Sequence, residues 1–484
     1  MATIIEQKPR FQYMPVGQDI IFTISNNSIV TNSNFISVKF IAEVHISNDG
    51  VPNLSTNTQV IGTFKTTPNN AAVGMFDFRP VVENYVKADH KALANSTYKT
   101  AVNTDLNTPL HLIDKFSGNN NSFRYLAIRF SIQYVDNDSA SATFGDLITE
   151  PFINSDNYNI INGYLKYTDK LETGTGNDSN DFGYNMQQFE FAYNTTTGGF
   201  LTNAPVVQYA NINDYGTVAM LNIAKVFKSP GGGSQPGVRY IVFTFLLEDG
   251  STVNDSIELV DIADGGFPFT QQDRAYNQIA FAGVFPANLR GWSTVFNSNI
   301  DNIVSYVFDV RSYLGAVAGI ASKTYQVIIN CPTLKGYEPI RIAWLNQWGG
   351  WDYYTFILKS TKKISTKGST YQQLEGTWNE STYKIDGFRG GKKAFRVNAT
   401  EKITMNSDYI SESESEWFEE LINSPEVYIL DGFQTDDSNA ILNHYVTPVR
   451  LTTKDYTKKT VANDKLIQYT FEVEKSKTLR TQSI

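Results

Sequence analysis

Strict alternation of apolar and polar residues recurs along this chain and limits its fold more than any other feature. The pattern occurs at 36–46, 126–134, 241–247 and 467–473. Residues two apart in a strand share a face, so each segment is predicted to be a strand with one buried face. No long helical segment is interleaved between them, which argues against a doubly wound α/β fold. We therefore expect a mainly β protein.

One helix is predicted near the C-terminus, at 411–423. Ser411 and Glu414 have the spacing of a capping box, in which each side chain accepts a hydrogen bond from the other residue's backbone. A stripe of apolar residues at helical spacing follows, formed by Trp417, Phe418, Leu421 and Ile422. Pro425 ends the segment, because proline cannot continue a helix.

The length of 484 residues exceeds one ordinary core, so several domains are expected. A polar stretch at 136–156 and the sequence Asn330-Cys331-Pro332 are the candidate boundaries. We divide the chain into two β-sandwich-like domains at 1–155 and 156–334 and a C-terminal assembly domain at 335–484. The predicted fold class is tandem β-sandwich domains followed by an α+β domain with a short glutamate-rich helix.

Charge and cysteine content exclude several kinds of site. The net charge is −9 and the pI about 5.1, which argues against general affinity for DNA. Cys331 is the only cysteine, so the chain forms no internal disulfide and no cysteine metal site, as suits a reducing cytoplasm. The four histidines have no metal-ligand spacing, and no apolar run is long enough for a membrane span. We expect no metal, no cofactor and no membrane partner.

No catalytic motif is present. The chain has no GxSxG elbow, HExxH pair, P-loop or Rossmann glycine pattern. We therefore expect a protein that is not an enzyme. A pair of carboxylates suited to glycoside hydrolysis stays open, because the distance between two acids cannot be read from a sequence.

Aromatic residues are densest at 344–356. Trp344, Trp348 and Trp351 lie within eight residues, and Tyr353 and Tyr354 follow. The Gly-Gly pair between the last two tryptophans predicts a sharp turn between two strands. One interpretation is a binding surface, with the tryptophans as interface anchors or as a platform for sugars, which requires at least one of them to be exposed. The other is an aromatic core at a domain joint, to which Trp417 of the predicted helix also belongs.

The next segment, 359–402, is basic. It holds ten Lys or Arg, including Lys362, Lys363, Lys392 and Lys393, against four acids, which leaves +6. The helix that follows carries five glutamates, Glu412 and Glu416 among them. Opposite charges on neighbouring elements can pair between identical subunits and steer assembly. A solvated face and a surface that contacts DNA in a lumen are the two alternatives.

The segment Tyr337–Phe356 resembles a known family. Its order of arginine, tryptophan, leucine and asparagine, followed by Gly-Gly-Trp-Asp, is similar to the signature of structural virion proteins of crAss-like and related marine tailed bacteriophages. Residues 395–408, 424–430 and 463–474 extend the resemblance. It is best over 325–484, weaker over 205–325, and reduced to Met75–Val82 before residue 155.

The resemblance implies a structural role. It predicts a neck or tail ring, or tail-hub, subunit with β-sandwich domains. The subunit would be made in the host cytoplasm and would form a homomeric ring in the virion beside portal, neck or tail components. It supplies no catalytic residues. A tail-borne receptor- or glycan-binding protein is the alternative function, and a polysaccharide hydrolase is a further one.

Overall fold

The computed structural model describes residues 2–48, 50–55, 59–92, 108–192, 194–221, 238–261, 267–268, 278–314, 317–330, 336–377, 379–432, 445–455, 457, 467–477 and 479–480. Strands hold 46 % of the residues and helices 10 %, which confirms the mainly β fold. The chain forms two compact units. Unit 1 contains the chain up to Ile329 together with Asn346–Asp352, and unit 2 contains residues 330–345 and most of the chain after Asp352.

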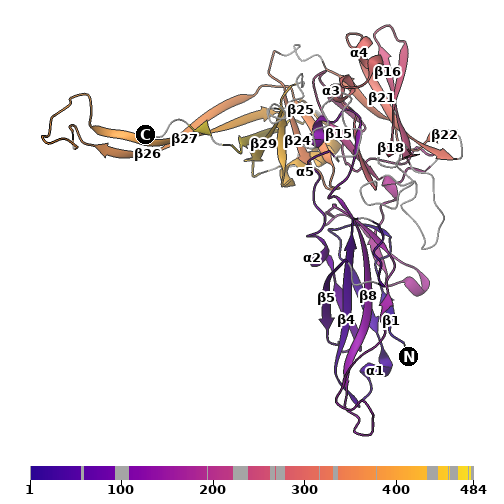
Figure 1. The fold of residues 1–484 in the computed structure, drawn as a ribbon. Coiled ribbons are helices and arrows are strands. Elements are labelled where there is room, and N and C mark those ends of the chain that lie inside the picture. The colour runs from indigo at the N-terminus through magenta and orange to yellow at the C-terminus, as the bar shows by residue number, and fades with distance from the viewer. Residues whose placement is uncertain are drawn as a thin grey trace. The chain divides into compact units, whose positions relative to one another are not determined.

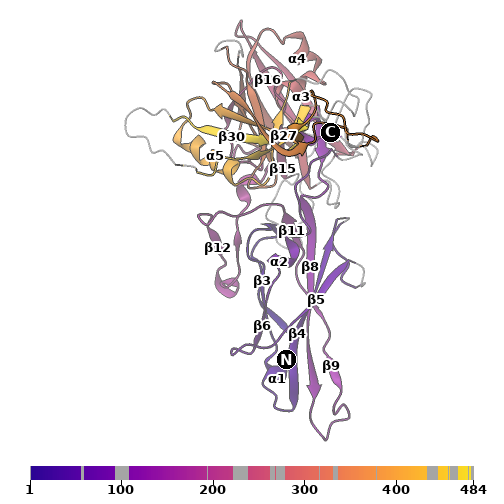
Figure 2. The same cartoon turned by 90° about the vertical axis from the view of Figure 1, so that its left-hand side faces the viewer.

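The N-terminal part of unit 1 is a β-sandwich. One sheet has the order β1 (Ile4–Gln7), β3 (Ile21–Ser25), β6 (Val73–Asp77). The other has the order β2 (Tyr13–Pro15), β11 (Tyr158–Ile161), β8 (Phe123–Asp136), β4 (Phe35–Ser47), β5 (Val60–Thr66), and β9 (Leu147–Thr149) and β10 (Ile153–Asn154) also pair with β8. Phe22 of the first sheet and Phe130 of the second share one apolar core, with ring centroids 5.2 Å apart. Figure 2 shows β3 and β6 beside β4 and β8.

The predicted buried face is confirmed in β4 and β8, but the opposite face is also partly covered, since His45 and Ser131 are fully buried. Phe40, Ala42 and Val44 of β4 are fully buried, as are Leu126, Ile128, Phe130 and Ile132 of β8. Ile36, which the alternation places on the same face, is 44 % exposed. The pairing of β4 with β8 shifts between Ile36 and Lys39, and Ser37 has a φ of 54°. Such a bulge inserts a residue and turns the preceding side chain away from the core.

Unit 1 contains further sheets. The largest has the order β14 (Val207–Ala210), β23 (Tyr325–Ile329), β21 (Ile303–Leu314), β16 (Val238–Leu247), β17 (Thr252–Glu258), and β22 (Val317–Ile320) pairs with β21. A second has the order β15 (Thr217–Leu221), β20 (Ile279–Gly283), β7 (Phe116–Gly118), and β12 (Leu171–Thr173) pairs with β13 (Phe182–Tyr184), as β18 (Val260–Asp261) does with β19 (Phe267–Pro268). The short helices are α1 (Asn27–Val30), α2 (Arg79–Val82), α3 (Pro286–Arg290), α4 (Thr294–Ser298), η1 (Leu110–Leu112), η2 (Gly176–Asp178) and η3 (Gln187–Phe189).

Unit 2 is built on one sheet whose strands differ in length. Its order is β25 (Trp351–Phe356), β24 (Ile340–Leu345), β28 (Val427–Leu430), β29 (Val446–Leu451), β30 (Thr470–Lys475), β27 (Gly391–Asn406), β26 (Thr361–Gln373), with β31 (Leu479–Arg480) beside β27. The predicted helix is α5 (Glu412–Asn423), and both hydrogen bonds of the Ser411–Glu414 capping box are present. Its residues Trp417, Phe418 and Leu421 are buried. The predicted α+β character of this part of the chain is confirmed.

The three-domain division stays a prediction. The N-terminal sheet continues past residue 155, since β11 pairs with both β8 and β2. The two compact units separate between Ile329 and Asn330. Within the described part of the chain, no helix has the length and apolar character needed to cross a membrane.

Candidate functional site

The hairpin of β26 and β27 extends far beyond the other strands of its sheet (Figure 1). We call residues 361–402 the arm. Near its base β27 also pairs with β30 through Lys402–Asn406 and with β31 through Asn398 and Ala399. Beyond this, β26 and β27 pair only with each other among the described strands, and we call residues 370–394 the outer arm. An isolated two-stranded ribbon is marginally stable in water, so the outer arm calls for a further partner.

The tip of the arm closes through specific backbone contacts. Asp386 N–H donates to the Glu375 carbonyl at 2.9 Å, and Thr377 N–H donates to the Lys384 carbonyl at 3.1 Å. Gly390 and Gly391 have φ values of 94° and 77°, which side chains with a Cβ rarely adopt. A Cβ on Gly390 would lie 2.8 Å from the Glu375 Cα. The tip therefore has a defined backbone conformation, and that conformation requires glycine at position 390.

Large apolar side chains on the arm are exposed. Phe388 and Ile385 are 78 % and 74 % exposed, and Ile364, Leu374, Tyr383 and Phe395 are each more than half exposed. Single exposed apolar residues are ordinary on a protein surface. Six of them on one projecting hairpin that has no core of its own form a surface suited to another polypeptide. The sequence interpretation missed these residues. The sequence pattern that could have identified them is an aromatic or aliphatic residue that recurs among the lysines of a long polar strand.

The predicted tryptophan cluster is divided between two separate cores. Trp344 is fully buried in unit 2, where its ring centroid lies 4.8 Å from that of Trp417 on α5. Tyr354 packs edge to face on Phe418 at 4.8 Å, and burial raises the pKa of its hydroxyl. Tyr353 is buried in the same unit, beneath the guanidinium of Arg341. Trp344, Trp417 and Tyr354 belong to the hydrophobic core between the sheet and α5, whereas Tyr353, next to Tyr354 in β25, lies on the opposite face of the sheet.

Trp348 and Trp351 belong to unit 1 instead. Trp348 is 2 % exposed and packs on Phe189 and Tyr184, with centroid distances of 4.9 and 5.3 Å. Trp351 is also 2 % exposed, and its indole N–H donates to the Asp89 carbonyl at 2.9 Å. With Trp344, Trp348 and Trp351 all buried, the requirement for a sugar-stacking platform is not met. All three tryptophans are core residues in the structure, and their place at a domain joint stays a prediction.

The predicted Gly-Gly turn is present, and Asn346 organises it. The Asn346 Oδ1 accepts from the N–H groups of Trp348 and Gly350, both at 3.0 Å. Its Nδ2 donates to the Leu201 carbonyl at 2.9 Å and to Asp352 Oδ1 at 2.8 Å. Gly349 has a φ of 76°, and a Cβ there would lie 2.2 Å from the Asn162 carbonyl oxygen. This turn is a structural element of unit 1.

The basic segment of the sequence coincides with the arm. Lys362 pairs with Glu338 at 2.8 Å. Lys363, Lys392 and Lys393 form no ion pair with any residue that the structure describes. Glu412 and Glu416 are exposed on α5. Pairing of these two charged elements between subunits remains a prediction.

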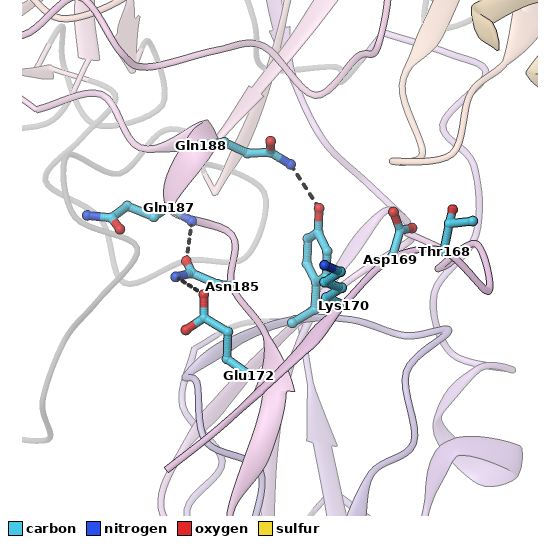
Figure 3. Close-up of a pocket in the computed structure, with 8 residues that line it drawn as sticks. Thr168, Asp169, Lys170, Glu172, Asn185, Gln187 and Gln188 are labelled. Carbon is cyan, nitrogen blue, oxygen red and sulfur yellow. Dashed lines mark hydrogen bonds between the residues drawn. The ribbon is translucent and has the colours of Figure 1, made fainter. Parts of the chain in front are cut away.

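A polar cavity of about 440 Å³ lies in unit 1 beside β12 and β13. Asn185 bridges two of its lining residues, donating to Glu172 and accepting from the Gln187 N–H (Figure 3). Asp169 accepts a hydrogen bond from Gln347 at 2.6 Å. Both carboxylates of this cavity are thus used in structural hydrogen bonds. Among the described residues, no group of three or more His, Cys, Asp or Glu side chains is placed to hold a metal ion.

Comparisons with known proteins identify no family. No protein-family model matches the chain, and no curated protein does. Among solved structures, the native conformation of E. coli alpha-2-macroglobulin aligns with 83 % of this chain at 7 % identity and a TM-score of 0.19. The chain spans only 21 % of that protein's length. A likeness at this level carries no argument about function.

Proposed function

We propose that this chain is a non-enzymatic structural subunit of a tailed-bacteriophage virion. In this proposal it forms a homomeric ring of the neck or tail and contacts adjacent virion components. The sequence signature within Tyr337–Phe356 supports the phage assignment, and the mainly β fold agrees with it. The observation that carries the assembly role is the outer arm, with its exposed apolar side chains.

The energetic argument rests on the side chains at the end of the arm. Ile385 and Phe388 are exposed by about three quarters of their surface. Fully burying one such side chain contributes about 1.5–3 kcal/mol. Docking the arm on another subunit recovers this free energy and also supports a ribbon whose two strands, in the outer arm, pair only with each other among the described strands. A contact between unlike surfaces of successive copies closes into a ring when the rotation between them allows it.

Electron microscopy and mass photometry of the purified chain test the proposal. We expect closed particles of one fixed size. The arm can be shortened by replacing residues 371–393 with Asn-Gly, because Thr370 and Ala394 face each other and a two-residue turn can join them. This variant lacks most of the outer arm and should be monomeric. Its near-ultraviolet circular dichroism should keep most of the tryptophan signal of the full chain, since the deletion removes Trp378 but leaves Trp344 and Trp417 in the core of unit 2.

A pair of matched variants separates the arm from general surface effects. Ile385→Ala with Phe388→Ala should weaken assembly, whereas Phe144→Ala with Leu147→Ala, on exposed residues of unit 1, should not. A full-length chain that stays single at high concentration would overturn the assembly role. The virion assignment is tested by mass spectrometry of purified phage particles, and absence of the chain from them would overturn it.

A further inference from the structure

The two faces of the arm have different chemistry. Residues opposite each other in an antiparallel pair share a face, and successive residues alternate between faces. The register pairs Lys363 with Lys402, Ser369 with Arg396, and Tyr371 with Lys393. One face therefore carries Lys363, Lys367, Lys393, Arg396 and Lys402, and no carboxylate from either strand. We call it the basic face. The other face carries Ile364, Val397 and Ala399 together with Lys362, Lys392 and Glu401, so its cations and carboxylates nearly balance.

Most of this positive charge has no internal partner. Lys402, at the base of the arm, pairs with Glu472 at 2.8 Å. The other four cations, Lys363, Lys367, Lys393 and Arg396, form no ion pair within the described part of the chain. On the other face Glu401 pairs with Lys475 at 3.0 Å. Near the base, Glu472 also interacts electrostatically with Lys363. Farther out, Lys367, Lys393 and Arg396 have no ion-pair partner among the described residues.

Lysines on an edge strand also protect against aggregation, and β26 is an edge strand. Protection alone does not account for the whole arm. Exposed apolar side chains, such as those of Phe388, Phe395 and Ile385, do not help a hairpin to remain solvated. Phe395 is next to Arg396 in β27, whereas Ile385 and Phe388 lie at the tip, where Lys384 and Arg389 pair with Glu380 and Asp386. Apolar anchors beside a face of one charge are the combination expected of a docking surface, where charge steers the encounter and apolar burial holds the complex.

We propose that the basic face of the arm docks on an acidic surface of a second copy of this chain. The segment 359–402 carries +6, so the other residues carry −15 of the total of −9. The rest of a second copy therefore carries a net charge opposite to that of the arm. This inference rests on the proposed assembly role and adds the partner and the force that selects it. DNA, the other polyanion that would fit such a face, is an outcome of the test.

Sedimentation velocity of the full chain between 50 and 500 mM salt tests the inference. We expect association to weaken steeply with salt. Lys363→Glu, Lys367→Glu, Lys393→Glu and Arg396→Glu together should weaken it at least tenfold. The control reverses four exposed lysines elsewhere, Lys39→Glu, Lys170→Glu, Lys323→Glu and Lys454→Glu, with the same change in net charge. Association of the control should stay within threefold of the unmodified chain. Circular dichroism checks that both variants are folded.

Each contrary outcome is distinct. Association that survives reversal of the basic face but disappears when the arm is shortened would overturn this inference and leave the assembly role intact. A chain that stays single at every salt concentration would overturn both. Tight binding of duplex DNA through the arm by a chain that does not self-associate would overturn the second copy as the partner.

Discussion

The rings of Tyr371 and Phe395 meet edge to face across the arm, with centroids 6.4 Å apart. Phe395 is the extra residue of a bulge, since Ser369 pairs with Arg396 and Thr370 with Ala394. A bulge bends a strand and strengthens its local twist. This aromatic pair therefore marks where the direction of the outer arm is set.

Replacing Phe395 with alanine should affect assembly more than folding. The ring is 52 % exposed, and an aromatic pair contributes about 0.5–1.5 kcal/mol, so the free energy of unfolding should fall by about 1 kcal/mol or less. Self-association in sedimentation velocity should weaken more than tenfold. Tyr167→Ala, on a fully exposed ring of unit 1, is the control and should change neither quantity. Equal effects of the two variants would contradict the role of Phe395.

Replacing Gly390 with alanine should open the tip of the arm without unfolding unit 2. The φ of 94° and the approach of a Cβ to Glu375 make the native turn unfavourable by about 1–3 kcal/mol. Hydrogen exchange at residues 374–390 should accelerate, while exchange in β24 and α5 stays unchanged. Gly387→Ala is the matched control, because a Cβ there meets no atom within 4 Å. Unchanged exchange in the Gly390 variant would show that the tip tolerates a side chain.

Replacing Asn346 with alanine should destabilise unit 1. The substitution leaves the N–H groups of Trp348 and Gly350 and the carbonyl of Leu201 without their partner in a buried site. Each unpaired buried group costs about 1–3 kcal/mol, and partial relaxation leaves an expected loss of about 2–4 kcal/mol in urea unfolding. Asn154→Ala, on an exposed residue of β10, should change stability by less than about 0.5 kcal/mol. Similar losses for both would argue against this hydrogen-bond network.

The stability of unit 1 should decline at high pH partly through Tyr325. Burial raises the pKa of its hydroxyl from 10.0 to about 12, although the Phe200 N–H donates to the hydroxyl oxygen. Between these values the unfolded chain loses the proton and the folded protein keeps it. The stabilisation is thus complete below pH 10 and is lost as the pH rises toward 12, at about 1.4 kcal/mol per pH unit. In urea unfolding at several pH values, Tyr325→Phe should show a shallower decline than the unmodified chain. Parallel declines would contradict this.

Local sequence determined the elements of this protein. The alternation at 126–134 predicts β8, the Ser411–Glu414 spacing predicts the start of α5, and the glycine pair predicts the turn at Gly349. Each of these depends on interactions within a few residues of one another. Strand geometry, helix capping and a positive φ are physical requirements that a short segment expresses by itself.

Only the tertiary structure decided which core each tryptophan joins and which strands stay uncovered. Trp344 finds Trp417 in unit 2, while Trp351 binds the Asp89 carbonyl, 262 residues away, in unit 1. A local pattern states that a side chain will be buried but not by which distant segment. Likewise, the Lys, Ser and Thr residues of β26 are compatible both with the solvent-facing side of a sheet and with a projecting two-stranded arm. The choice depends on whether another strand lies beside it, which is set by the path of the whole chain.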